Sequence, residues 1–215
     1  MNRANSEWRT VNKNNLKDGF TLVEVIILFV IFITVAVLVV PLAVDDAVTA
    51  KNTAEWQRVQ SSFASIPISM MNTQKYKQSG VVSLEHFITA LIKVHPLRNV
   101  VSYKIKYMNG DPSDGIYKFN EIYNTDFGAS IAFNWFEDKD KVLGEDRMEG
   151  VLMYDVNGKR GPNVWGKDVF GMNIYANKIE PFGKGVDPMT VETDCSRQGR
   201  GLYCSYAVLH NVQEP

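Results

Sequence analysis

The chain has 215 residues, of which 45% are hydrophobic and 22% are charged, and its 23 Lys and Arg nearly balance its 24 Asp and Glu. Its length suits one compact domain plus a separate segment, and no internal repeat or second domain is evident. A charge balance this close to neutral excludes a general nucleic-acid-binding surface. The local basic cluster Lys159, Arg160 and Lys167 could still contact DNA, although a solvated loop is the simpler interpretation.

Residues 1–19 form a polar leader that ends at a Gly-Phe junction. Its basic residues outnumber Glu7 and Asp18, and they are Arg3, Arg9, Lys13 and Lys17. In an ordinary secretory signal the apolar stretch precedes the cleavage site and is removed with it. Here the apolar stretch follows Gly19, so cleavage after Gly19 would keep it in the mature protein.

The apolar stretch is long enough to cross a membrane. Between Val25 and Val44 the only polar side chain is that of Thr34. About 20 helical residues span about 30 Å, the thickness of a hydrocarbon core. We predict a transmembrane helix over about 22–44. Basic residues precede it and Asp45 follows it, so the leader is expected in the cytoplasm and the rest of the chain across the membrane.

Glu24 places a carboxylate at the start of this apolar stretch. Such a charge costs about 2 to 3 kcal/mol on insertion scales unless it is paired or reaches the interface. Glu24 either extends to water or pairs with a positive charge from another subunit. Cleavage after Gly19 would create such a charge at the new amino terminus of Phe20.

The residues Gly19, Phe20, Thr21, Leu22 and Glu24 resemble the processing motif of type IV pilins and of the pseudopilins of type II secretion. The resemblance implies cleavage between Gly19 and Phe20 by a prepilin peptidase and N-methylation of Phe20. It also implies that Glu24 neutralises the amino terminus of a neighbouring subunit during filament assembly at an inner-membrane platform. The partners would be the chain itself and other pilins or pseudopilins, with the head periplasmic or extracellular.

Pro41 lies where this family usually has a helix-kinking proline. Proline removes one backbone hydrogen bond and clashes with the preceding turn, so Pro41 either marks the helix end or softens a helix that packs in a filament. The resemblance favours the second interpretation and implies a ladle-shaped fold. Its long helix would cover 20–75, and its head would cover 76–215.

After the apolar stretch, a second periodic stripe predicts that the helix continues and docks on the head. The stripe consists of Trp56, Val59, Phe63, Ile66 and Met70. Pro67 is expected to bend or end this helix, and 74–80 is expected to be a polar turn. A further helix should begin after Ser83 as N-cap and end before Pro96. Its predicted apolar face consists of Leu84, Phe87, Ile88, Leu91 and Ile92.

From residue 100 onward, short segments rich in β-branched and aromatic residues predict an antiparallel sheet. We expect strands near 101–107, 116–123, 130–136 and 150–154, with one face on the long helix, and a solvated hairpin loop over 137–147. Helices followed by strands indicate an α+β fold.

The segment from Asp155 to Asp168 concentrates oxygen donors on a tightly turning backbone. Asp155, Asn157, Asn163 and Asp168 could together bind Ca²⁺, although the spacing is not that of an EF-hand. The same residue types also build turns without metal. Several type II secretion pseudopilins bind Ca²⁺ in a loop of the head, so the resemblance adds some support to a calcium site.

The two cysteines, Cys195 and Cys204, are close enough in sequence to form a disulfide in an exported head. A zinc site is the alternative, but only His210 lies nearby in sequence. Many type IV pilins have a comparable bridge near the carboxyl end.

No catalytic motif is visible. The histidines His86, His95 and His210 are scattered, and no nucleophile elbow or phosphate-binding loop is present. We therefore predict a structural subunit rather than an enzyme, either a type II secretion pseudopilin or a type IV pilus subunit. The calcium-like loop favours the first and the disulfide favours the second. The alternative is a membrane-tethered periplasmic binding protein with a prepilin-type anchor.

Overall fold

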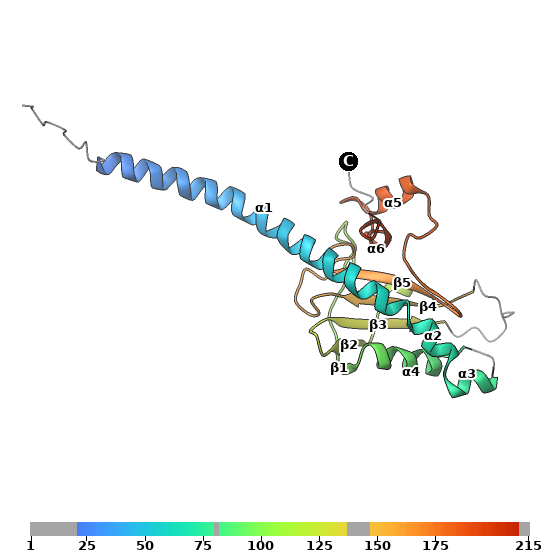
Figure 1. The fold of residues 1–215 in the computed structure, drawn as a ribbon. Coiled ribbons are helices and arrows are strands. Elements are labelled where there is room, and N and C mark those ends of the chain that lie inside the picture. Colours follow the sequence, from blue (N-terminus) through green and yellow to red (C-terminus); the bar gives the residue numbers. More distant parts are fainter. Residues whose placement is uncertain (1–20, 80–81, 137–146, 211–215) are drawn as a thin grey trace, which may run out of the picture. The chain divides into compact units, whose positions relative to one another are not determined.

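The computed structural model describes residues 21–79, 82–136 and 147–210. It has a mixed α+β fold with an N-terminal apolar helix and a six-stranded antiparallel sheet (Figure 1), which confirms the predicted class. The chain divides into two compact units, Met1–Asp45 and Asp46–Pro215. We call the second unit the head. It begins well before residue 76, because the last part of the first helix belongs to it.

Helix α1 extends from Leu22 to Phe63 and passes through position 41 without interruption. It therefore ends before residue 75, where the long helix was predicted to end. α1 ends at Phe63, four residues before Pro67, so the helix ends near Pro67 as predicted. Pro67 lies in the first turn of α2 (Ile66–Met71), where its missing N–H breaks no helical hydrogen bond. The prediction of a turn over 74–80 was wrong for 74–79, because Gln74–Ser79 form helix α3.

The predicted stripe docks on the head as expected. Trp56, Phe63, Ile66 and Met70 are fully buried, and Val59 is nearly so. The ring of Trp56 stacks on that of Phe170 in strand β5 (Val169–Tyr175), with centroids 5.1 Å apart. The last turns of α1 are thus part of the hydrophobic core.

Helix α4 (Leu84–Val94) begins as predicted with Ser83 as its N-cap. Ser83 Oγ accepts from His86 N at 3.4 Å and Ser83 N donates to His86 Nδ1 at 3.1 Å, so a histidine completes a capping box that usually contains Glu or Gln. Phe87 and Leu91 are buried as predicted. Ile92 was predicted to lie on the same apolar face, but it is 46% exposed and lies outside the buried face of α4.

The sheet follows chain order, with each strand antiparallel to the next. Its strands are β1 (Leu97–Val101), β2 (Ile122–Thr125), β3 (Ser130–Trp135), β4 (Met148–Asp155), β5 (Val169–Tyr175) and β6 (Ile179–Pro181). The strands predicted over 130–136 and 150–154 are confirmed as β3 and β4.

Two strand predictions were largely wrong. Only residue 101 of the segment 101–107 lies in a strand, and 116–123 begins in the 3₁₀ turn η1 (Gly115–Tyr117) before it reaches β2. Segment 102–107 leaves the sheet, and within it only Lys106 forms β-bridges, with Pro112 and Val164. Alternation therefore did not indicate the backbone partners of this segment. The predicted loop 137–147 lies outside the described residues except for Arg147.

Both faces of the sheet are covered. Ile131, Phe133 and Trp135 of β3 face the cluster formed with α1 and α4, so one face of the sheet lies on the long helix as predicted. Ala132 faces a second cluster, in which Ile105, Trp165 and other residues from loops pack on the opposite face. The sheet is therefore the middle layer of the head, and loops rather than helices form its third layer.

Candidate functional site

The predicted processing residues Gly19 and Phe20 lie outside the described residues. Immediately after them, Thr21 and Glu24 form a reciprocal cap at the start of α1. Glu24 Oε2 accepts from Thr21 N at 3.0 Å and from Thr21 Oγ1 at 3.1 Å, and Glu24 N donates to Thr21 Oγ1 at 3.2 Å. This is the Thr-x-x-Glu capping box, a local signal that the sequence itself contains.

The cap leaves part of the Glu24 carboxylate free. Glu24 is exposed, and within the described chain its second oxygen, Oε1, accepts no hydrogen bond. One oxygen therefore stabilises the helix start, while the other can accept a bond from a group outside this chain.

The apolar part of α1 has no contact that would bury it. Leu22–Val39 is the one stretch in the described residues that is long and apolar enough to cross a membrane, and none of its side chains is buried. Thr34 Oγ1 donates to Val30 O at 2.7 Å, so the only hydroxyl in this stretch is satisfied within the helix. Such a segment is stable in lipid or against the apolar surface of other helices, because in water its apolar side chains would be in unfavourable contact with solvent.

The loop between β4 and β5 brings the four predicted calcium ligands together. Asp155 ends β4, and Asp168 immediately precedes β5. Asp168 Oδ2 accepts from Asn163 N at 2.8 Å and from Asn157 Nδ2 at 3.2 Å. Asp168 Oδ1 accepts from Val164 N at 2.7 Å. The four side chains are therefore neighbours in the folded chain.

The second carboxylate of the loop is held from outside it. Asp155 Oδ1 accepts from Asn157 N at 3.1 Å, and Asp155 Oδ2 accepts from the hydroxyl of Tyr103 at 2.7 Å. Tyr103 was missed as part of this site because it precedes Asp155 by 52 residues and no motif connects them. Only the folded chain, which turns 102–107 away from the sheet, places it there.

Both carboxyl groups are completely buried. Burial raises the pKa of Asp155 to about 8, with a smaller raising contribution from the neighbouring Asp168 and an opposing one from the hydrogen bonds that Asp155 accepts. Burial also raises the pKa of Asp168, although hydrogen bonds from Val164 N and Asn163 N oppose the shift. No Lys, Arg or His of the described residues forms an ion pair with either group.

Two atoms of this loop bear on metal binding. Asn157 Oδ1 is buried without a hydrogen-bond partner among the described residues. The amide of Asn163 lies 3.1 Å from Gly158 O and 3.3 Å from Asp155 Oδ2, and it donates to both when its nitrogen faces them. With the opposite orientation three oxygens would face one another, an arrangement that a cation between them would stabilise.

The donor set therefore fits Ca²⁺ only in part. Asp155, Asn157 and Asn163 could supply oxygens together with the Gly158 carbonyl, whereas both oxygens of Asp168 are occupied by N–H donors. Among the described residues no group of three or more His, Cys, Asp and Glu side chains could hold a metal. Asp168 is better placed to hold Asn157 and Asn163 in position than to bind a cation directly.

Cys195 and Cys204 form the predicted disulfide. It joins the end of α5 (Pro188–Asp194) to the first residue of α6 (Cys204–Ala207). A Cβ on Gly166 would lie 2.7 Å from Cys204 Sγ, so the disulfide packs against the end of the β4–β5 loop. The two features that the sequence presented separately are thus neighbours in the head.

Ser205, next to the disulfide, connects α1 with the sheet. Its carbonyl accepts from Trp56 Nε1 at 2.9 Å, and its hydroxyl accepts from Gly171 N at 2.9 Å. All three residues are deep in the core, where an unpaired polar group would be costly. Ser205 is therefore hydrogen-bonded to both α1 and β5. We call α6, the short helix that contains Ser205, the wedge.

Comparisons of the chain with protein-family models, with curated proteins and with solved structures gave no match.

Proposed function

We propose that this protein is a filament subunit of the type IV pilin or type II secretion pseudopilin class. In this proposal the chain is cleaved after Gly19, retained in the inner membrane by α1, and assembled through α1 into a filament. The observation that carries the proposal is an apolar helix of membrane-spanning length, unburied from Leu22 to Val39 and beginning at a capped carboxylate. A ladle-shaped subunit with an exported head belongs to the same proposal.

The exposed surface of α1 supports assembly. Burying apolar surface contributes about 25 cal/mol per Å², so this segment gains stability either in lipid or against the helices of other subunits. A helix that passes from one environment to the other needs an apolar surface on all sides, and α1 has one. This is consistent with partners that include a prepilin peptidase, other pilins or pseudopilins, and an assembly platform.

In this proposal the carboxylate of Glu24 binds the amino terminus of a neighbouring subunit. Cleavage would leave an amino group on Phe20, adjacent to the cap formed by Thr21. Glu24 Oε1 is available to accept a charge-assisted bond from the amino terminus of another subunit, and such bonds are about twice as strong as neutral ones. The cap would hold the carboxylate in place while its free oxygen makes the intersubunit bond.

The test separates the capping role of Glu24 from its charge. Gln can replace Glu in a capping box, so Glu24→Gln keeps the cap and removes the charge. We expect normal insertion into membranes but loss of filaments, measured by immunoblotting of sheared filaments and of membrane fractions. Thr21→Val, which weakens the cap and keeps the charge, should still assemble.

Normal filaments from Glu24→Gln would contradict the assembly role of the carboxylate. Intact surface function in cells that make no filaments would instead favour the alternative, a membrane-tethered periplasmic binding protein.

Calcium binding by the β4–β5 loop remains a proposal within this function. The orphaned oxygen of Asn157 and the facing groups of Asn163, Gly158 and Asp155 support it. A bound cation would neutralise a buried carboxylate that has no cationic side chain beside it. Calcium binding by this loop would favour a type II secretion pseudopilin over a type IV pilus subunit.

A further inference from the structure

One end of the head collects basic side chains around an exposed phenylalanine. The turn between β2 and β3 contains Phe127, which is 77% exposed. This turn packs on the β4–β5 loop, because a Cβ on Gly158 would lie only 2.6 Å from Gly128 O. Arg160 lies beside the same turn, with Nη2 3.7 Å from the Cβ position of Gly128.

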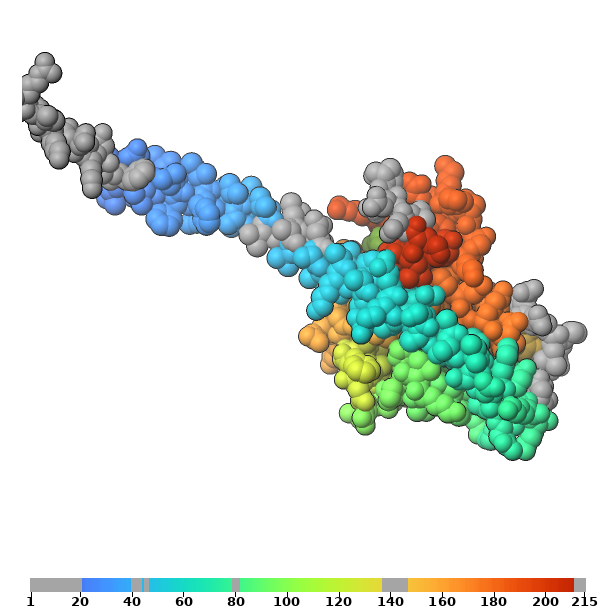
Figure 2. All heavy atoms as spheres, in the orientation of Figure 1, coloured from blue at the N-terminus to red at the C-terminus, as the bar shows by residue number. Residues whose placement is uncertain are grey.

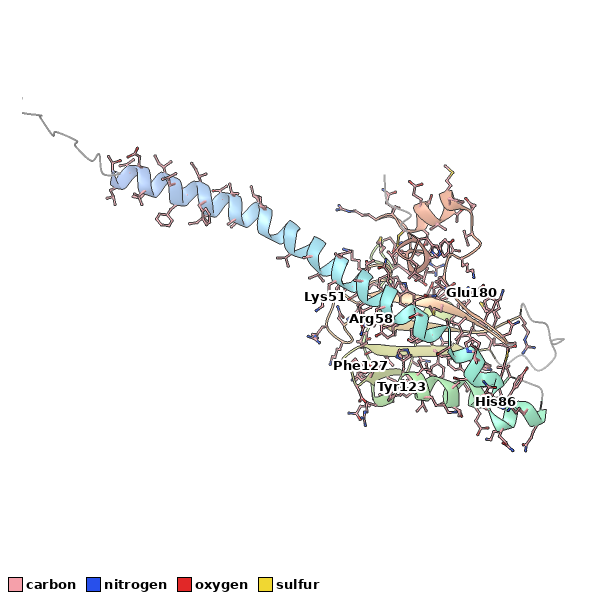
Figure 3. All side chains as sticks on the ribbon, in the orientation of Figure 1. Lys51, Arg58, His86, Tyr123, Phe127 and Glu180 are labelled. Atoms are coloured by element: carbon pink, nitrogen blue, oxygen red, sulfur yellow. A yellow bond between two sulfur atoms is a disulfide. The ribbon has the colours of Figure 1, made fainter. Side chains whose placement is uncertain are left out.

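The β4–β5 loop also contacts the part of α1 that belongs to the head. Asn52 Nδ2 donates to Lys167 O at 3.3 Å, which places this loop next to Lys51. Figure 3 shows Lys51 and Phe127 at the same end of the head, and Figure 2 shows the loop and the turn exposed there beneath α1. We call this surface the basic end. It consists of Lys51, Phe127, Lys159, Arg160 and Lys167.

The cations of the basic end are not neutralised by carboxylates. Lys51, Lys159 and Arg160 are exposed and Lys167 is half-buried, and none forms an ion pair with a residue that the structure describes. Among the acidic residues near these cations in sequence, Glu55 pairs with Arg58 and Asp126 with Arg98, while Asp155 and Asp168 are buried and form no ion pair with the described residues.

Two further lysines extend the same surface. Lys104 and Lys106 are both exposed, and the segment that carries them is hydrogen-bonded to the β4–β5 loop from Lys106 N to Asn163 O at 3.0 Å.

The basic end is also the part of the head that the chain reaches first. The head begins at Asp46, directly after the apolar segment, and Lys51 follows five residues later. At a rise of about 1.5 Å per residue this is about 8 Å along the helix. Along the chain, Lys51 of the basic end is therefore within about two helical turns of the end of the apolar segment.

We propose that the basic end binds the anionic phospholipid headgroups of the bilayer that α1 spans, with Phe127 entering the interface. Basic side chains near an anionic bilayer each strengthen binding by a factor of about five. An aromatic side chain among them adds apolar contact at the headgroup boundary. The contact would hold the head against the membrane before assembly and would be given up when the subunit leaves the bilayer.

Nucleic acid would be attracted by the same charges. The membrane is the better partner, because the cluster includes an exposed apolar ring and one of its lysines, Lys51, follows the apolar segment closely in the chain. The inference rests on the proposed membrane-spanning role of α1, but it concerns a different surface.

Hydrogen exchange of the full-length protein in nanodiscs tests this inference. Nanodiscs of phosphatidylcholine are compared with nanodiscs that also contain phosphatidylglycerol. We expect the amides of 126–129 and 158–161 to exchange at least about fivefold more slowly in the anionic nanodiscs. The charge reversal K159E/R160E/K167E should abolish this protection, and Phe127→Ser should weaken it. The matched reversal K77E/K93E/K118E, which changes the net charge equally at other exposed positions, should retain it.

The outcomes distinguish this inference from the proposed function. Failure to enter nanodiscs would contradict both. Incorporation with equal exchange in the two lipids, or protection that survives K159E/R160E/K167E, would overturn the lipid contact alone. Protection by an added DNA duplex in phosphatidylcholine nanodiscs, without protection by phosphatidylglycerol, would identify a nucleic-acid surface and refute the membrane inference.

Discussion

His95 is a buried histidine that connects α4 to α1. It is the C-cap residue of α4, and its Nε2 lies 2.8 Å from Ser62 Oγ. Ser62 Oγ donates to Val59 O at 2.6 Å, so it accepts from His95 and Nε2 carries the proton. The imidazole also packs against Phe63, with ring centroids 4.5 Å apart. A second proton would therefore place a charge in an apolar environment.

This environment predicts a loss of stability in mild acid. Burial lowers the pKa of His95 below its ordinary value of 6.5. The unfolded chain therefore binds the proton first as the pH falls, so the stability is present above pH 6.5 and decreases below it, by at most about 1.4 kcal/mol per pH unit. His95→Gln should show a smaller decrease between pH 7 and 5, measured by urea unfolding of both proteins. Parallel pH profiles would contradict this account.

At the residue scale, the sequence indicated some roles and concealed others. Ser83 was recognisable as a cap because capping depends only on local spacing. The partner of Asp155 was not recognisable, since Tyr103 reaches it through the folded chain. Glu24 combines both cases: its cap with Thr21 is local, whereas its proposed bond to another subunit is not.

At the scale of elements, the β4–β5 loop is a polar network inside an apolar head. Its turns need a left-handed backbone at Gly158 and Asn163, with φ of 63° and 55°. Gly has no Cβ to oppose this conformation and Asn tolerates it better than most residues, which explains why these residue types occur here. The loop is held by its own hydrogen bonds, so it can form with or without a cation.

Calcium should stabilise this loop if the proposed site exists. We expect Ca²⁺ to raise the midpoint of thermal unfolding of the full-length protein in detergent, and Mg²⁺ to have a smaller effect because it requires a stricter geometry. A concentration of 100 times Kd would contribute about 2.7 kcal/mol. Asn157→Ala, which removes the orphaned oxygen without removing a buried charge, should reduce the shift. Equal midpoints with and without Ca²⁺, and no heat on titration, would eliminate the site.

The elements that were predicted incorrectly share a cause. Segment 102–107 alternates like a strand, but its backbone bonds to 111–113 and, at Lys106, to 163–165 rather than to the sheet. Strands β5 and β6 were missed because they follow a segment that was interpreted only as a site. Local patterns indicate an extended backbone, while the choice of partner depends on long-range packing.

For the whole molecule, the disulfide secures the wedge that joins α1 to the sheet. Replacing both cysteines (C195S/C204S) should lower the free energy of unfolding by about 2 to 3 kcal/mol, because a closed loop of about ten residues limits the unfolded chain. Denaturant unfolding of the oxidised protein and of the variant measures the difference. Because Ser205 follows Cys204, hydrogen exchange at Gly171 N should also accelerate in the variant. Equal stability and equal exchange would show that the wedge holds without the bridge.

The sequence by itself determined the features that depend on neighbours along the chain. An apolar segment of membrane length, a capped helix at Ser83, the buried stripe from Trp56 to Met70 and the pairing of the only two cysteines follow from spacing, length and composition. These features depend on local periodicity and on chain proximity, which a linear sequence contains.

Only the tertiary structure decided which distant residues meet. It placed Tyr103 on Asp155, Ser205 between Trp56 and Gly171, and the turn at Phe127 beside Arg160. Each of these contacts closes a long loop, and its energy comes from burial and hydrogen bonds that exist only once the sheet and α1 have packed together. The surfaces from which this protein's interactions are inferred are therefore products of the fold.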